Sequence, residues 1–266
     1  MMVKKLESKM EILFGLIGII FMVIFLPITA ILTPGYTPLE NTVSSLGEGI
    51  MKTLFSICFV VTGSLLIPFY IYLERELVNI KENIRRLATG VSIFTCVCIA
   101  LVGVIPDKTH WDFFMAFHSF VAAVSFIGSS IYIVLYSILM YYVPKSKMYH
   151  GPKFKKYLAF FGFFIGFLLI ILLISLNPLI EWILTVSIAF WIIITAIQCI
   201  SYKFFNIPGL YYKRSQFPDA LKRFEEALQI LDRLNIYDDP IAETLKENIE
   251  FIKKEIERKS KKLNNI

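Results

Sequence analysis

Residues 157–176 read YLAFFGFFIGFLLIILLISL, a run that contains no charged side chain. A helix of this length rises about 30 Å, which matches the hydrocarbon thickness of a lipid bilayer. Five other long apolar runs occur in the chain, at about 11–33, 53–74, 88–106, 113–143 and 180–202. The sequence therefore predicts an all-α protein whose first domain, residues 1–205, is a bundle of six transmembrane helices.

The composition also indicates that lipid is the solvent for most of the chain. Hydrophobic residues make up 56% of it and the mean hydropathy is +0.66, which is far above the usual range of soluble domains. The formal charge of +6 comes from loops and a tail that can meet lipid headgroups, so we expect no nucleic-acid partner. The four cysteines show no metal-binding spacing, and we expect neither a metal nor another cofactor.

The loops alternate between rich and poor in basic residues. Lys and Arg gather in the N-terminus and in the loops 75–87 and 144–156, and they are scarce in the loops 34–52, 107–112 and 177–179. The positive-inside rule then predicts a multi-pass protein of the cell membrane with both termini in the cytoplasm. A cleaved signal peptide is the alternative interpretation of the first run, because Lys4 and Lys5 precede it and Ala30 ends a passable cleavage site.

Residues 206–266 form a second, charged domain. Two amphipathic patterns predict a soluble helical hairpin; their apolar positions are Ala220, Leu221, Phe224, Ala227, Leu228 and Leu231, then Leu245, Ile249, Ile252, Ile256 and Leu263. Pro240 suits the first position of the second helix, with Asp239 as its N-cap. A weak resemblance to one tetratricopeptide repeat covers the run from Tyr211 to Phe217 together with Ala220, Phe224 and Ala227, but such repeats need several units. We expect the tail to contact a cytoplasmic protein or the anionic membrane surface.

Small residues predict where the membrane helices meet. Gly162 and Gly166 form a G-x-x-x-G step in the fifth run. In the fourth run, Ala122, Ser125 and Ser129 follow His118 at spacings of four, three and four, so the four residues share one helical face. We expect this stripe to face the bundle, and close packing is sufficient to explain it.

Polar residues of the outer side make up the candidate ligand-binding site. They come from three separate places in the sequence and comprise Asn41, Ser44, Ser45, Asp107, His110, His118 and Glu181. An imidazole facing the interior near a carboxylate can bind a headgroup, hold a metal or act as a general base. The alternative is that His118 bonds a neighbouring helix while the acids cap helices. A three-histidine zinc site is excluded, because His150 lies in a cytoplasmic loop of the predicted topology.

Short motifs also point to a family. The stretch from Ile105 to His110, followed by Ala116, Phe117 and His118 and then by Ala122, Phe126, Gly128, Tyr132 and Leu139, resembles the damage-regulated autophagy modulator family, which includes the Frag and Sfk proteins. Glu181-Trp182 is similar to that family too. The loop 36–47 is closer to a prokaryotic membrane family that is known only as a domain of unknown function. The resemblance spans residues 11–202 and implies six transmembrane helices and a link to membrane lipids.

Three functions are compatible with these observations. The first is a non-enzymatic protein that engages a membrane lipid in an outer polar cavity shared by His118, Asp107 and Glu181. The second is a membrane-embedded lipid hydrolase or transferase in which His118 acts with Asp107 or Glu181 and Ser45 is the nucleophile. The third, a small-solute transporter, is disfavoured because the runs hold almost no ionisable groups.

Overall fold

The structure, a computed structural model, describes residues 2–78, 80–105, 112–143, 151–152, 154–202, 221, 225–226, 228–229, 231–233 and 240–263. Helices are the only regular elements among these residues. The chain divides into two compact units, Met1–Phe205 and Asn206–Ile266, which are described separately below.

The first unit consists of six long helices joined by short segments. They are α1 (Met2–Leu32), α2 (Lys52–Glu76), α3 (Glu82–Val104), α4 (Asp112–Tyr142), α5 (Lys156–Ser175) and α6 (Pro178–Ile200). Each contains a segment long and apolar enough to cross a membrane, which confirms the predicted all-α architecture. The chain is a multi-pass membrane protein. Helix α3 begins at Glu82 rather than near residue 88, because its charged first turn stays helical and pairs Arg86 with Glu82 at 2.5 Å.

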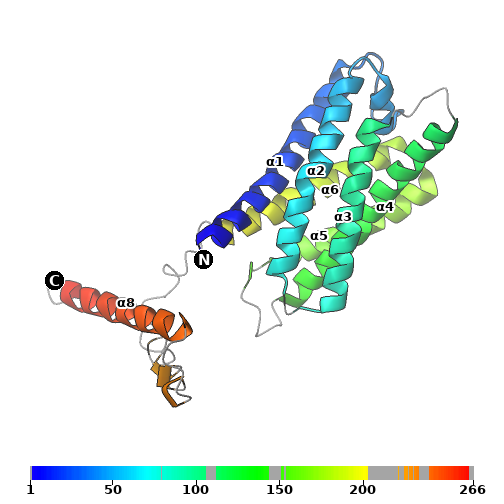
Figure 1. The fold of residues 1–266 in the computed structure, drawn as a ribbon. Coiled ribbons are helices and arrows are strands. Elements are labelled where there is room, and N and C mark those ends of the chain that lie inside the picture. Colours follow the sequence, from blue (N-terminus) through cyan, green and yellow to red (C-terminus); the bar gives the residue numbers. More distant parts are fainter. Residues whose placement is uncertain are drawn as a thin grey trace. The chain divides into compact units, whose positions relative to one another are not determined.

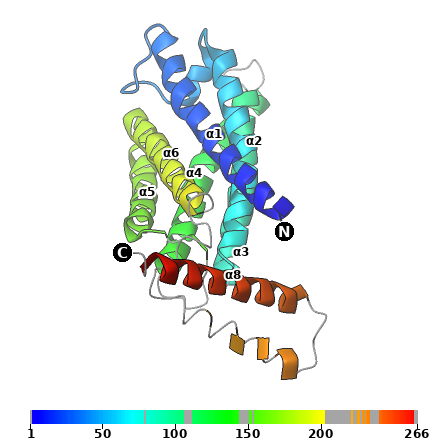
Figure 2. The same cartoon turned by 90° about the vertical axis from the view of Figure 1, so that its left-hand side faces the viewer.

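The six helices form a closed ring. Each packs against the next in chain order, and α6 returns to pack against α1 (Figure 1). Figure 2 shows α1 between α2 and α6. Residues 33–51, the first loop, include the short 3-10 helix η1 (Ser44–Glu48). We call the end of the bundle that carries this loop the loop end, and the opposite end the basic end.

Helices α4 and α5 meet at the predicted G-x-x-x-G step. A Cβ atom on Gly162 would collide with Ser137 Oγ of α4 and would lie 3.1 Å from Trp191 Nε1 of α6. A Cβ on Gly166 would lie 2.8 Å from Val134 Cγ2. No side chain fits at either position without movement of its neighbours, which confirms that these glycines bring the helices together.

Other contacts between neighbouring helices also depend on glycine. A Cβ on Gly63 of α2 would lie 2.8 Å from the backbone nitrogen of Ala100 in α3, and one on Gly128 of α4 would collide with Thr95 Oγ1 of α3. Close backbone approach adds dispersion contacts, which matter in lipid because apolar burial between helices brings little gain there.

Several charged groups near the basic end have polar partners. Glu11, the acid that opens the first apolar run, forms an ion pair with Arg75 of α2. Arg85 is buried and donates a hydrogen bond from Nη1 to the carbonyl of Glu74 at 3.1 Å. These partners lower the cost of placing charges beside hydrocarbon.

A tight turn joins α5 to α6. Leu176 ends α5 with φ +48°, in the left-handed region, and 77% of its surface is exposed. Asn177 caps α6 by accepting a hydrogen bond from the backbone N–H of Leu179 at 2.8 Å, and Pro178 occupies the first helical position.

The second unit contains α8 (Pro240–Leu263), which begins at the predicted proline. The side chains of Ala242, Ile249 and Ile252 are buried on one face of α8. Lys253 pairs with Glu225 at 3.1 Å, and residue 225 is itself helical. The residues of the predicted tetratricopeptide likeness, such as Tyr211, Phe224 and Ala227, lie outside the described residues.

Candidate functional site

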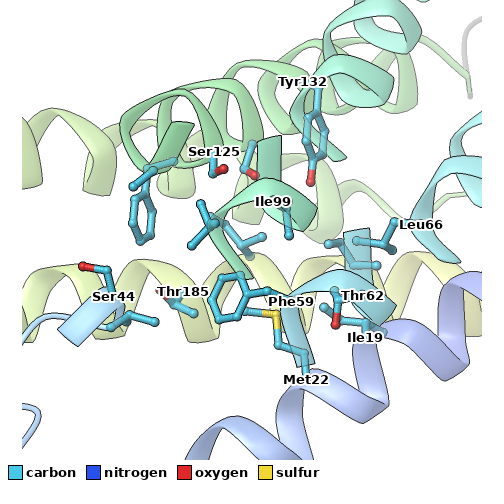
Figure 3. A pocket seen from close by; sticks show the side chains of 17 residues that line it. Ile19, Met22, Ser44, Phe59, Thr62, Leu66, Ile99, Ser125, Tyr132 and Thr185 are labelled. Atoms are coloured by element: carbon cyan, nitrogen blue, oxygen red, sulfur yellow. The ribbon is translucent and has the colours of Figure 1, made fainter. Parts of the chain in front are cut away.

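A cavity lies inside the ring of helices. Its lining comes from α1, α2, α3, α4, α6 and the first loop, and it has about 60 Å³ of space open to water-sized molecules (Figure 3). The residues that line it are Ile19, Met22, Val43, Ser44, Phe59, Thr62, Leu66, Ile99, Val102, Ala122, Ser125, Phe126, Ser129, Tyr132, Thr185, Ile188 and Ile192. We call this space the central cavity.

The lining of the central cavity is apolar with interspersed hydroxyl groups. Three of these hydroxyls donate to backbone carbonyls of helices: Thr62 to Gly18 at 3.0 Å, Ser125 to Val121 at 2.7 Å, and Thr185 to Glu181 at 2.8 Å. Each hydroxyl oxygen keeps acceptor capacity after this donation. The cavity therefore offers hydrocarbon contacts and a few neutral polar groups.

Three of the four residues of the predicted stripe on α4 border this cavity. His118, Ser125 and Ser129 are buried, and Ala122, Ser125 and Ser129 belong to the lining. The expectation that the stripe faces the bundle is confirmed. Close packing does not explain it, however, because three of its members border open space.

The first loop is attached to the start of α6 beside the central cavity. Glu181 Oε1 accepts a hydrogen bond from the backbone N–H of Val43 at 2.9 Å. Trp182 Nε1 donates to Tyr36 Oη at 2.9 Å, and Tyr36 Oη donates to the carbonyl of Thr42 at 2.8 Å. Two residues of α6 thus hold two points of the loop, and we call these four residues, Tyr36, Val43, Glu181 and Trp182, the loop clamp.

The environment of the loop clamp changes the acidity of its phenol. Burial raises the pKa of Tyr36 from its ordinary value of 10.0 to about 12, and the Glu181 carboxylate adds to the rise. Hydrogen bonds with Trp182 and Ser45 act in the opposite direction. Tyr36 is therefore a neutral hydrogen-bonding group at physiological pH.

The other candidate residues of the first loop make local contacts. Asn41 donates from its side chain to the carbonyl of Thr37 at 3.3 Å, and Ser45 Oγ donates to the carbonyl of Thr42 at 2.7 Å. Ser44 Oγ lies 3.3 Å from Thr42 Oγ1 and also lines the central cavity. Asn41 and Ser45 therefore shape the loop, whereas Ser44 borders the open space.

His118 lies in a different pocket. It is 2% exposed, and its Nδ1 donates to the carbonyl of Ile105 at 2.6 Å. It borders a second cavity of about 270 Å³ at the loop end, together with Gly47, Lys52, Thr53, Phe55, Ser56 and residues 102–105. Because a carbonyl oxygen can only accept, Nδ1 carries the proton of this hydrogen bond.

The structure describes only part of the predicted cluster of His118, Asp107 and Glu181. The His118 side chain bonds to Ile105 at the end of α3, and the Glu181 side chain bonds to the first loop. Asp107 and His110 lie outside the described residues. Among the residues that the structure does describe, no group of three or more His, Cys, Asp or Glu side chains could hold a metal ion.

Sequence reasoning missed two features of the site. Tyr36 and Trp182 hold the first loop, and the only signal for them was their place in the motifs that carried the resemblance. Tyr132 lines the central cavity, and it continues the stripe of α4 at a spacing of three residues after Ser129. That spacing could have added it to the candidate residues.

Comparison with known proteins gives one match. A family model described as a protein of unknown function (DUF998) matches residues 16–198, a range that reaches from α1 to α6 and stops before the tail. No curated protein and no solved structure was found to match the chain. The likeness to the damage-regulated autophagy modulator family therefore stays a prediction. Since the match covers more than half of the chain and all six membrane helices, this protein belongs to the DUF998 family.

Proposed function

We propose that this protein binds a membrane lipid inside its central cavity and covers it at the loop end with the first loop. The observation that carries the proposal is the cavity itself: five helices and the first loop surround a mostly apolar space within a membrane protein. Ligand pockets are typically apolar concavities with a few placed polar groups. Acyl and isoprenoid chains are the abundant apolar molecules of a bilayer.

The loop clamp supports the proposal. Val43 and Ser44 line the central cavity, and Val43 is bound to Glu181 of α6. A loop that both borders the cavity and is attached across the ring can control how a lipid enters. Glu181 then has a positioning role, since its carboxylate holds the backbone of the loop.

Helix α4 supplies a matched pair of variants to test lipid binding. Ala122 lines the central cavity, whereas the adjacent Ala123 is exposed on the surface of the bundle. We expect lipid to remain on the wild-type protein and on Ala123→Phe through a delipidating detergent wash, and to be lost from Ala122→Phe. Native mass spectrometry measures the retained lipid. Retention by Ala122→Phe, or a wild-type protein without lipid, would contradict the proposal.

We also propose that both termini lie in the cytoplasm and that the tail contacts a protein or the anionic leaflet there. Arg75, Lys81, Arg85, Lys155 and Lys156 gather near the basic end, which supports this orientation. Single cysteines at positions 155 and 176, in a protein lacking the native cysteines, test it with an impermeant reagent on whole cells. We expect labelling at position 176 only, and labelling at position 155 alone would reverse the topology.

The hydrolase or transferase alternative finds less support. Ser45 and Glu181 both bond to the backbone of the first loop, and His118 bonds to the backbone of Ile105. These contacts suit structural roles. The alternative remains testable, because it predicts that His118→Ala abolishes turnover of a lipid that the intact protein cleaves.

A further inference from the structure

The part of the central cavity nearest the basic end carries hydroxyl groups from α4. Ser125, Ser129 and Tyr132 succeed one another along the inner face of this helix. Figure 3 shows the hydroxyl of Tyr132 pointing from α4 toward the side chains of the other helices that line the cavity. Behind it, the ring of Tyr132 packs on the ring of Tyr70, with 4.8 Å between their centroids.

The hydroxyl of Tyr132 is buried and poorly satisfied by its surroundings. Tyr70 and Ser129 are its neighbours, but none of the described residues makes a hydrogen bond of normal geometry with its buried Oη. Tyr136, one turn further along α4, differs because its Oη lies 3.0 Å from Thr89 Oγ1. A buried donor without an acceptor destabilises the folded protein, and a ligand oxygen at this point would remove that cost.

The lining of the central cavity carries no charge. None of its 17 residues is Lys, Arg, His, Asp or Glu. A phosphate group placed here would lose its hydration and find no cation among the described lining residues, which strongly disfavours its binding. An uncharged oxygen avoids this penalty and still accepts a hydrogen bond.

The membrane setting makes this polar contact decisive. A lipid chain is already in an apolar medium before it enters the cavity, so burial of the chain contributes little to selectivity. Differences between lipids must then arise from shape and from their polar groups. Tyr132 is a buried lining residue whose hydroxyl has no hydrogen-bond partner of normal geometry among the described residues.

We propose that the central cavity selects an uncharged lipid that bears an alcohol or ester oxygen, and that this oxygen accepts a hydrogen bond from Tyr132. The inference rests on the proposed function and names the class of lipid that it involves. Anionic phospholipids are excluded from the cavity by the same reasoning.

Photolabelling of the protein in nanodiscs tests the proposal. The probes are a long-chain alcohol with a diazirine near the end of its chain and the alkyl phosphate with the same chain and diazirine. We expect the alcohol to label peptides of α4 and α6, and the phosphate to label them at least tenfold less. In Tyr132→Phe, labelling by the alcohol should fall about three- to tenfold, the value of one net hydrogen bond. Tyr136→Phe is the matched control and should label like the wild-type protein.

Each outcome separates the two proposals. Equal labelling by alcohol and phosphate in the wild-type protein overturns the selection of uncharged lipids, and this comparison needs no variant. Unchanged labelling in a folded Tyr132→Phe protein overturns the role of Tyr132. In both cases lipid binding itself stands. If neither probe labels the cavity peptides of the wild-type protein, the proposed function fails as well.

Discussion

Helix α4 presents small residues to two regions of the molecule, and the two regions differ. Toward α5, Ser137 lies against Gly162 so closely that no Cβ fits between them. Toward the centre of the ring, Ala122 and Ser129 border the central cavity. Small residues on a helix therefore mark a face that points into the bundle. They do not show whether that face packs against another helix or borders a cavity. In a ring of six helices, neighbours can close up while the centre stays open.

The largest expected effect comes from breaking the contact of α4 with α5. Gly162→Leu should lower stability by about 3 kcal/mol or more, because overpacking forces Ser137 and Trp191 to move. The melting temperature in detergent measures the loss. Gly90 of α3 is the control, since a Cβ there meets nothing within 4 Å. Gly90→Leu should leave the melting temperature unchanged or slightly higher. An equal loss of stability in both variants would show that the close contact at Gly162 is not the cause.

A second pair of variants compares the two regions directly. Ala122→Leu fills part of the central cavity and should raise the stability of delipidated protein by about 1 kcal/mol. Ala159 of α5 is fully buried in a packed cluster, and Ala159→Leu should lower the stability by about 1–3 kcal/mol. Thermal unfolding of both proteins checks the opposite signs. If both variants lose stability alike, the central space is not available to a side chain.

The loop clamp should respond to alkaline pH. Tyr36 has a pKa raised from 10.0 to about 12, so its neutral form stabilises the folded state fully below pH 10. This contribution is lost as the pH rises from about 10 toward 12, where the folded protein must also release the proton. Chemical denaturation across this range should show a smaller alkaline loss in Tyr36→Phe than in the wild-type protein. Identical pH profiles would exclude Tyr36 as a source of the dependence.

The smallest expected effect concerns the turn between α5 and α6. Leu176 adopts a left-handed conformation that glycine tolerates without strain. Leu176→Gly should therefore raise stability by about 0.5–1 kcal/mol, while Leu176→Ala keeps the strain and should not. Thermal unfolding distinguishes the two variants. A gain of stability in Leu176→Ala would instead show that the exposed leucine side chain, and not the left-handed backbone, lowers the stability.

The sequence predicts the fold well for a physical reason. Hydrocarbon accepts only helices whose backbone groups are satisfied internally, so long apolar runs determine both the type and the number of the elements. The G-x-x-x-G step at Gly162 predicts a helix contact because nothing larger fits there. These features depend on local sequence and on a constant solvent.

The site is harder to predict because it depends on which side chains meet across the ring. Val43 and Glu181 are 138 residues apart in the sequence, so no spacing pattern predicts their hydrogen bond. The stripe on α4 indicates an inner face but does not reveal whether that face meets a helix or a cavity. His118 was the most conspicuous residue in the sequence, yet it borders the second cavity and not the central one.

The contact between α1 and α6 has a consequence for the synthesis of this protein. Chains fold from the N-terminal side as they emerge, so α1 to α5 insert before α6 does. Until α6 docks, α1 to α5 would form an open arc, and Ile19 and Met22 of the future cavity wall would have no α6 opposite them. The interior would then be continuous with the surrounding bilayer. Docking of α6 would then enclose whatever occupies the centre, so that a lipid bound as proposed could be acquired during biogenesis, before any entrance through the finished wall is required.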